Sequence, residues 1–178
     1  MTKTELRYTM LEKRMQLSKE TIEMYSKEAV KKIQKHPYYI HANHIGIYHP
    51  IKNELNILDL TNDKKHFALP VVHDDDMQYH PYHLGADLVE SALHIQEPTL
   101  DKIVDETLDL LIVPALAVTL DGDRLGYGKG FFDRFIEHHP TIKTLSVVID
   151  FQVIKTLPQT LQDQKIDQII IVGDTYDY

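Results

Sequence analysis

The chain has 178 residues, of which 43% are hydrophobic and 26% charged, a composition that excludes a disordered chain. Its 19 basic and 27 acidic residues give a formal net charge of −8, so we expect no nucleic-acid partner and no membrane partner. Cysteine is absent, which excludes disulfides and thiolate catalysis and is typical of a cytoplasmic protein. The first residues lack an apolar leader, so we expect no secretory signal.

Helices are expected first along the chain. Residues 2–17 carry apolar side chains at helical spacing, and Ser18 is suited to N-cap a second helix that ends at His36-Pro37. Two later segments, residues 54–60 and 131–139, are also expected to be helical.

Five short apolar segments alternate with helical or polar stretches after residue 43. Several lack a polar–apolar alternation, which is typical of strands buried on both faces. The expected strands are residues 44–48, 66–72, 108–113, 144–149 and 168–172. The pattern predicts an α/β fold, a single three-layer domain over residues 1–178, with a mainly parallel central sheet flanked by helices. We expect a monomer.

A glycine-rich segment concentrates the chemistry of the sequence. Four of the seven glycines fall within residues 122–130, between an expected strand and an expected helix. Three of them alternate: Gly126, Gly128 and Gly130. Basic residues accompany them: Arg124, Lys129 and Arg134. Alternating glycines let backbone amides face one concavity, and a helix N-terminus adds partial positive charge.

The glycine segment therefore favours a phosphate-binding loop, and the alternative is a glycine-rich turn without a ligand. It contains neither a Walker sequence nor a dinucleotide fingerprint. Asp133, just inside the following helix, is either a magnesium ligand or an N-terminal helix carboxylate. The eleven histidines show no metal-binding spacing.

Motifs spread over the chain resemble one family. The signature-like stretch is Arg124-Leu-Gly-Tyr-Gly-Lys-Gly-Phe-Phe-Asp-Arg134, preceded by Leu111-Ile-Val-Pro-Ala-Leu-Ala. Further matches are Lys3-Thr-Glu-Leu-Arg7, Ile47-Tyr48-His49-Pro50 with Glu54, Phe67-Ala-Leu-Pro70 and Ile95-Gln-Glu-Pro98. Together they resemble 5-formyltetrahydrofolate cyclo-ligases, also called methenyltetrahydrofolate synthetases. Where the family usually has Tyr-Tyr, this chain has Phe131-Phe132, which retains stacking but not the hydroxyls.

The resemblance implies an enzyme that uses ATP and Mg²⁺ to convert 5-formyltetrahydrofolate to 5,10-methenyltetrahydrofolate, with ADP and phosphate released. It implies two catalytic residues, Arg124 and Lys129. The implied ATP-binding residues are Lys3, Arg7, Arg124, Leu125, Gly126, Tyr127, Gly128, Lys129, Gly130, Phe131 and Phe132. The implied folate-binding residues are His49, Glu54, Met77, Tyr79 and Glu97. The implied metal-associated acids are Asp133 and Asp163, with Asp167 as a rival to Asp163.

The sequence also allows purely structural roles for these residues. Lys3 and Arg7 also suit a solvated helix face, Glu54 a helix cap, and Glu97 a loop. The alternatives are a non-catalytic ATP sensor that uses the same loop, or a different ATP-dependent enzyme on a related scaffold, which would rest on fold analogy alone. A second pocket with its own acid, Glu54, favours the enzyme over the sensor.

Overall fold

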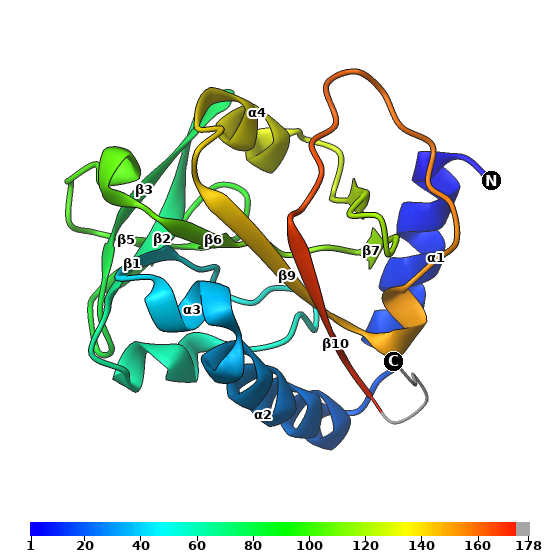
Figure 1. The fold of residues 1–178 in the computed structure, drawn as a ribbon, viewed down its shortest axis with the longest axis horizontal. Helices are drawn as coiled ribbons and strands as arrows, with labels where there is room; N and C mark the ends of the chain where they lie inside the picture. The colour runs from blue at the N-terminus through cyan, green and yellow to red at the C-terminus, as the bar shows by residue number, and fades with distance from the viewer. Residues whose placement is uncertain (174–178) are drawn as a thin grey trace.

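A computed structural model describes residues 1–173 of the chain (Figure 1). Its helices are α1 (Lys3–Met15), α2 (Lys19–Lys35), α3 (Pro37–His41) and α4 (Phe131–His138). The strands of the main sheet are β1 (His44–Gly46), β2 (His66–His73), β3 (Asp76–Tyr82), β6 (Leu110–Ile112), β9 (Lys143–Ile149) and β10 (Gln168–Val172). Two small ribbons pair β4 (Leu88–Glu90) with β5 (Gln96–Pro98), and β7 (Ala117–Val118) with β8 (Arg124–Leu125).

The main sheet has the strand order β10-β9-β6-β1-β2-β3. All its neighbours are parallel except β2 and β3, which confirms the prediction of a mainly parallel α/β sheet. One face carries α2 and α3 over a large apolar cluster that includes Ile33, Ile45 and Leu110. The other face packs against α4 through Leu111, Val113 and Phe135. The helices therefore flank the sheet on both sides (Figure 1).

The expected helix ends are recognisable from local chemistry. Thr2 and Glu5 form a reciprocal capping box at the start of α1, and Ser18 Oγ accepts the Thr21 N–H at the start of α2. Pro37 ends α2 but also begins α3, where the His36 ring accepts the Tyr38 N–H. The short helix α3 was not expected from the sequence.

The strand β3 was also missed, and the helix expected over residues 54–60 was wrong. Pro81 and a run of acids obscure β3, which tolerates a proline because it is the edge strand. Residues 54–57 form a loop, which follows a turn at Lys52 and Asn53, both with positive φ. A 3₁₀ helix begins only at Leu58.

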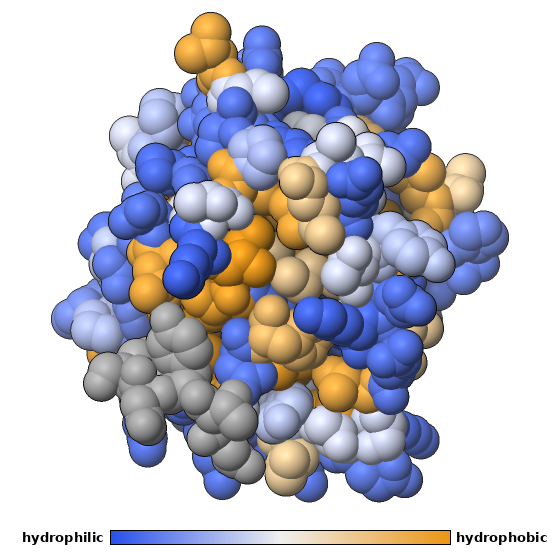
Figure 2. All heavy atoms as spheres, turned by 90° about the vertical axis from the view of Figure 1, so that its right-hand side faces the viewer, coloured by the Kyte–Doolittle hydropathy of each residue, from blue (hydrophilic) through white to orange (hydrophobic). Residues whose placement is uncertain are grey.

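The first helix, α1, packs beside the small β7–β8 ribbon rather than on a face of the main sheet (Figure 1). Met10 is its buried anchor, in contact with a cluster that includes Leu116 and Leu125. Figure 2 views the side of the molecule where α1 lies and shows hydrophobic surface near its middle, bordered by hydrophilic residues. Among residues 1–173, no helix is long and apolar enough to span a bilayer.

Gly46 at the end of β1 generates the first prediction. A Cβ at this position would lie 2.6 Å from Leu111 Cδ2 and 2.7 Å from Tyr79 Cε1. Both atoms belong to fully buried side chains. We expect Gly46→Ala to lower the free energy of unfolding by about 1–3 kcal/mol, because it overpacks the core. Urea unfolding measures the change, and an unaltered midpoint would contradict the packing.

Candidate active site

The carboxyl edge of the sheet is the natural place for a site. From β1 the chain proceeds to β2 on one side, whereas β6, β9 and β10 lie on the other. The order therefore reverses between β1 and β6, and ligands of open α/β sheets bind outside the carboxyl ends of strands at such a point. Two segments leave this edge, residues 47–54 after β1 and residues 113–130 after β6, and both carry predicted site residues.

One face of α1 is directed at the glycine segment. Residues 3, 7, 10 and 14 share this face by helical spacing, so three cations surround the buried Met10. Arg7 Nε donates a hydrogen bond to Gly126 O at 2.9 Å. Arg7 therefore lies against the glycine loop, rather than on the solvated face that was its alternative at the level of sequence.

The glycine loop has backbone conformations that favour glycine. Gly128 has a φ of +99°, and a Cβ there would lie 3.2 Å from Arg7 Cζ. Gly130 has a φ of +74° and is the N-cap of α4. Within residues 1–173 no side chain caps this helix, so its first amide N–H groups remain as donors at the loop. Leu125 is different, since its side chain lies in the core and its carbonyl binds the Leu116 N–H.

The two predicted catalytic cations differ in burial. Arg124 is 7% exposed, donates from Nη1 to Pro114 O at 2.7 Å and lies 5.4 Å from the centroid of the Phe132 ring. Burial lowers its pKa, and Asp133 opposes this most strongly, so the guanidinium stays charged. Lys129, in contrast, is exposed on the glycine loop. The site thus has one buried and one solvent-exposed positive charge.

The predicted acids lie at the start of α4 and in the segment before β10. Asp133 Oδ1 accepts the Gln164 N–H at 3.1 Å, and Asp163 Oδ2 binds Lys3 Nζ at 2.5 Å. Burial raises the pKa of Asp163, but the hydrogen bonds from Lys3 and Thr160 outweigh this effect and the net pKa is below its usual value.

The rival acid, Asp167, has a structural role. Its Oδ2 accepts both the backbone N–H of Thr144 at 2.9 Å and the Thr144 hydroxyl at 3.2 Å, which ties β10 to β9. Within the described part of the chain, no three His, Asp or Glu residues cluster as a ready-made metal site. A pair of carboxylates such as Asp133 and Asp163 fits Mg²⁺ only when phosphate and water supply the other ligands.

Glu54 is the acid of the second segment. It is 6% exposed, and its Oε1 accepts the Ile51 N–H at 2.8 Å. Burial raises its pKa to about 7, and Arg14 is the largest of the influences that lower it. The bond to Ile51 closes a turn and caps no helix, so the helix-cap alternative was wrong.

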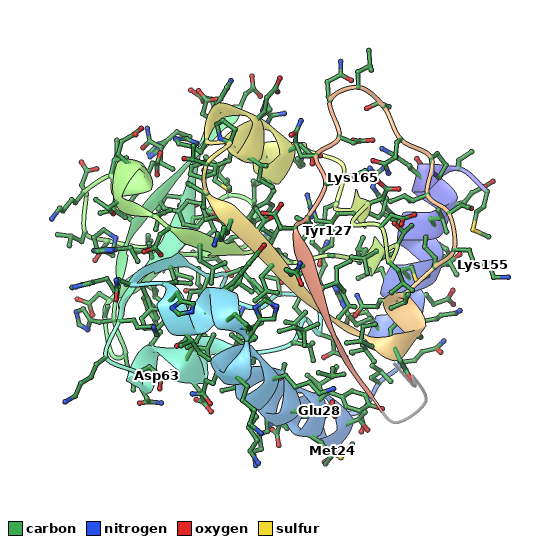
Figure 3. The ribbon with its side chains drawn as sticks, viewed as in Figure 1. Met24, Glu28, Asp63, Tyr127, Lys155 and Lys165 are labelled. Carbon is green, nitrogen blue, oxygen red and sulfur yellow. The ribbon has the colours of Figure 1, made fainter. Side chains whose placement is uncertain are left out.

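Two residues near Glu54 were not recognised as its partners from the sequence. Tyr127 donates its hydroxyl to Glu54 Oε2 at 3.3 Å, and Arg14 Nη2 donates to the Tyr127 hydroxyl oxygen at 2.5 Å. Figure 3 shows Tyr127 between the sheet and α1. Arg14 is only 2% exposed, and its place on the same helical face as Lys3 and Arg7 was the signal that could have found it.

The other predicted folate residues are spread along the sheet. Met77 lines a cleft of about 240 Å³ between β3 and α4, together with Phe131 and Arg134. Tyr79 is fully buried, and its ring packs over Gly46. The Glu97 carboxylate accepts the Val72 N–H at 2.8 Å, which ties β5 to β2.

Three buried polar atoms of the predicted site have no hydrogen-bond partner within residues 1–173. They are His49 Nδ1, Tyr79 Oη and Arg124 Nε. Tyr79 and Arg124 also influence each other electrostatically, which places the phenol near the guanidinium. Buried polar atoms without partners are rare in folded proteins, and a bound water, ion or polar ligand is one way in which they are satisfied.

Comparison with known proteins decides the family. The model of the 5-formyltetrahydrofolate cyclo-ligase family matches residues 1–172. The chain belongs to this family. It is therefore an enzyme of the cyclo-ligase family, as the resemblance predicted.

Relatives and solved structures agree with this family. The 5-formyltetrahydrofolate cyclo-ligase of Escherichia coli K12 is 27% identical, covering 94% of this chain and 98% of the relative. That of Mycolicibacterium smegmatis is 32% identical over 57% of each chain. The structure of Aquifex aeolicus 5,10-methenyltetrahydrofolate synthetase matches with a TM-score of 0.83 and 29% identity, covering 100% of this chain and 97% of the other. The fold is thus that of the family.

Burial of Glu54 predicts a pH-dependent cost to stability. The folded protein binds the proton of Glu54 more tightly than the unfolded chain, because the pKa rises from 4.5 to about 7 on folding. Stability from this group is present below about pH 4.5 and is lost as the pH rises through 7. Glu54→Gln should therefore stabilise the protein by up to about 3 kcal/mol at pH 8 and by little at pH 5.

Urea unfolding at the two pH values measures this difference. Glu12→Gln, at an exposed position of α1, is the matched control and should leave stability nearly unchanged at both. A gain for Glu54→Gln that is equal at pH 5 and pH 8 would contradict the raised pKa.

Proposed function

We propose that the protein catalyses the ATP- and magnesium-dependent conversion of 5-formyltetrahydrofolate to 5,10-methenyltetrahydrofolate, in one-carbon metabolism. The formyl oxygen attacks the γ-phosphorus of ATP and ADP leaves. The second folate nitrogen then attacks the activated formyl carbon and gives up its proton to solvent, and phosphate leaves as the ring closes. A formamide oxygen is a poor leaving group, so phosphorylation removes the main chemical obstacle.

The observation that carries this proposal is the meeting of two chemically different segments at one sheet edge. The glycine loop with Arg7 and Arg124 is suited to phosphates, and the buried Glu54 is suited to hydrogen-bond donors. Both leave the carboxyl edge, from β6 and β1 respectively, where the order of strands reverses. A sensor of ATP alone would have no use for the second segment.

The phosphates are assigned to the glycine loop. The amides of Gly128 and Gly130 and the first turn of α4 offer donors, and Lys129 is exposed and able to reach the transferring phosphate. Arg124 is held by Pro114 and Phe132, so it requires little reorganisation when charge develops. Lys3 and Arg7 extend the positive charge from α1.

Magnesium is assigned to Asp133 and Asp163. Among the bonds made within residues 1–173, Asp133 uses Oδ1 and Asp163 uses Oδ2, so one oxygen of each carboxylate is left for a cation. The ion would neutralise phosphate charge when bound with ATP. The Lys3 ammonium, on Asp163, adds a second positive charge beside it.

The folate is assigned to the edge formed by Glu54. An ionised carboxylate accepts hydrogen bonds only, so it recognises the donor edge of a pterin. His49 Nδ1 is a buried polar atom that a ligand would satisfy, whereas Tyr79 is fully buried and packs over Gly46. Met77 lines the cleft between β3 and α4, which Glu54 and His49 do not line, so it would contact the folate only if the ligand extended that far.

An absorbance assay tests the proposed function directly. Purified protein is mixed with 5-formyltetrahydrofolate, ATP and Mg²⁺, and the formation of methenyltetrahydrofolate is followed with time. The proposal requires product only when ATP is present. Product formation that is independent of ATP, or no product at all from folded protein, would overturn it.

Asp133→Asn tests the assignment of magnesium. Asparagine Oδ1 can still accept the Gln164 N–H, so we expect the fold to persist while turnover falls by about 10² to 10⁴. Asp167→Asn is the control, because Asp167 is engaged with Thr144, and it should keep the wild-type requirement for Mg²⁺. A magnesium titration of both variants checks this, and full activity of Asp133→Asn would exclude the metal role.

Gly128→Ala tests whether the glycine loop holds the phosphates. The substitution strains a positive φ and brings a methyl group against Arg7, so the loop should lose its cradle and ATP affinity should fall at least tenfold. Isothermal titration with ATP measures the affinity, and a thermal melt measures the strain.

Gly85→Ala is the matched control for that experiment. Gly85 has a φ of +84° but no atom within 4 Å of its Cβ position, so it carries the same strain without the crowding. We expect similar losses of melting temperature and an ATP affinity close to wild type. If Gly128→Ala binds ATP as tightly as the wild type does, the assignment of the phosphates to the glycine loop is wrong.

A further inference from the structure

We propose that Arg14 and Tyr127 are positioning residues for the folate, which hold the Glu54 carboxylate in place from the nucleotide side of the site. The inference rests on the proposed role of Glu54 in folate binding. It reassigns the Tyr127 hydroxyl, since the resemblance placed Tyr127 with ATP. It also gives a role to Arg14, which neither the motifs nor the comparisons single out.

A chain of hydrogen bonds joins the three side chains. Arg14 Nη2 donates to the Tyr127 hydroxyl oxygen at 2.5 Å, and that hydroxyl donates to Glu54 Oε2 at 3.3 Å. The other carboxylate oxygen, Oε1, is held by the Ile51 N–H. Glu54 is thus anchored at both oxygens, by its own turn and by the glycine segment, and its plane is set before a ligand arrives.

Arg14 also fastens the Glu54 turn to α1. Its Nε donates to Lys52 O at 3.0 Å, and Asn53 Nδ2 donates to the carbonyls of Arg14 and Leu17 at 3.0 and 3.2 Å. Lys52 and Asn53 both have positive φ. Two consecutive non-glycine residues in this region are strained, so these contacts with α1 stabilise a turn that would otherwise relax.

The two arginines of α1 contact neighbouring residues of the glycine segment. Arg7 holds the carbonyl of Gly126, and Arg14, two turns later, holds the side chain of Tyr127. The same helix therefore contacts the phosphate loop and the residue that contacts Glu54. Removing the Tyr127 hydroxyl should weaken folate binding, because this hydroxyl forms its hydrogen bonds with other side chains and not with the glycine amides.

The charges that face Glu54 come from every element around it. Arg14 lies on α1, Lys52 on its own turn and Tyr127 on the glycine segment, and Glu54 in turn raises the pKa values of Tyr48 and Arg124. Burial raises the pKa of Glu54, and Arg14, Ile51, Tyr127 and Lys52 lower it, in that order. Loss of the Tyr127 hydroxyl or of Arg14 should therefore raise the pKa further.

The first test uses the protein without ligands. Carbon-13 NMR of glutamate-labelled protein follows the titration of Glu54, whose signal is assigned by its loss in Glu54→Gln. We expect Tyr127→Phe to move the Glu54 midpoint upward by about 0.5–1 pH unit. Tyr48→Phe is the matched control, because the Tyr48 hydroxyl is buried nearby but donates to Leu55 O. An unmoved midpoint in Tyr127→Phe overturns the proposal.

The second test separates folate from ATP. Calorimetric titrations at pH 6.5 and pH 8.5 measure the affinities of 5-formyltetrahydrofolate and of ATP separately. For Tyr127→Phe we expect folate affinity to fall roughly five- to tenfold at pH 6.5 and less at pH 8.5, with ATP affinity within about twofold of wild type. Equal losses for both ligands, or a folate affinity unchanged from wild type at both pH values, would refute the positioning role.

Variants of Arg14 extend this test to α1. Arg14→Lys keeps the charge but not the two-donor geometry, and it should show the same folate-selective loss. Lys13→Met, at the neighbouring exposed position, is the control for altering a cation on α1 and should bind both ligands as wild type does. If Arg14→Lys does not fold, Tyr127→Phe alone decides.

The two hypotheses fail differently. Wild-type protein that binds no 5-formyltetrahydrofolate at any pH would overturn the proposed function, and the folate role of Arg14 with it. Wild-type protein that binds folate, together with a Tyr127→Phe variant that binds it equally well, would leave the proposed function intact and overturn only this inference.

Discussion

The docking of α1 on the carboxyl edge of the sheet is the contact on which the site depends. Its inward face combines one apolar anchor, Met10, with three cations at positions 3, 7 and 14. The anchor lies among Leu116 and Leu125, next to the glycine segment. Burial of this side chain fixes where the cations lie, and they in turn hold Asp163, Gly126 and Tyr127. The helix α1, which covers neither face of the sheet, thereby positions the residues of the site at its carboxyl edge.

The site combines several features that reduce stability. Glu54 is a carboxylate in a nearly water-free position, and Arg124 is a buried guanidinium with one unpartnered nitrogen within the described chain. The turn before Glu54 and the glycine loop both use positive φ. Such features cost free energy in the folded state and persist at functional sites because preorganised charges accelerate chemistry and orient ligands. The two large apolar clusters of the sheet supply the compensating stability.

Much of the fold could be predicted from local patterns. The five parallel strands are short runs of branched apolar residues, whose burial on both faces suppresses alternation, and the helix caps at Thr2 and Ser18 follow from side-chain chemistry. The errors arose where tertiary contacts override local propensity. The edge position admits Pro81 into β3, and the contacts between Asn53 and α1 fix a turn directly before the segment where a helix was expected.

The sequence by itself determined the family, the mainly parallel sheet and the composition of the glycine loop, because these depend on residue types at short spacing. Only the tertiary structure decided which side chains meet. It separated Asp163, paired with Lys3, from Asp167, which joins β9 to β10, although the two acids are four residues apart. It also brought Arg14, Glu54 and Tyr127 together from three distant segments. Spacing along a chain carries no information about such contacts, since they form only when α1, the turn after β1 and the glycine segment pack at one edge of the sheet.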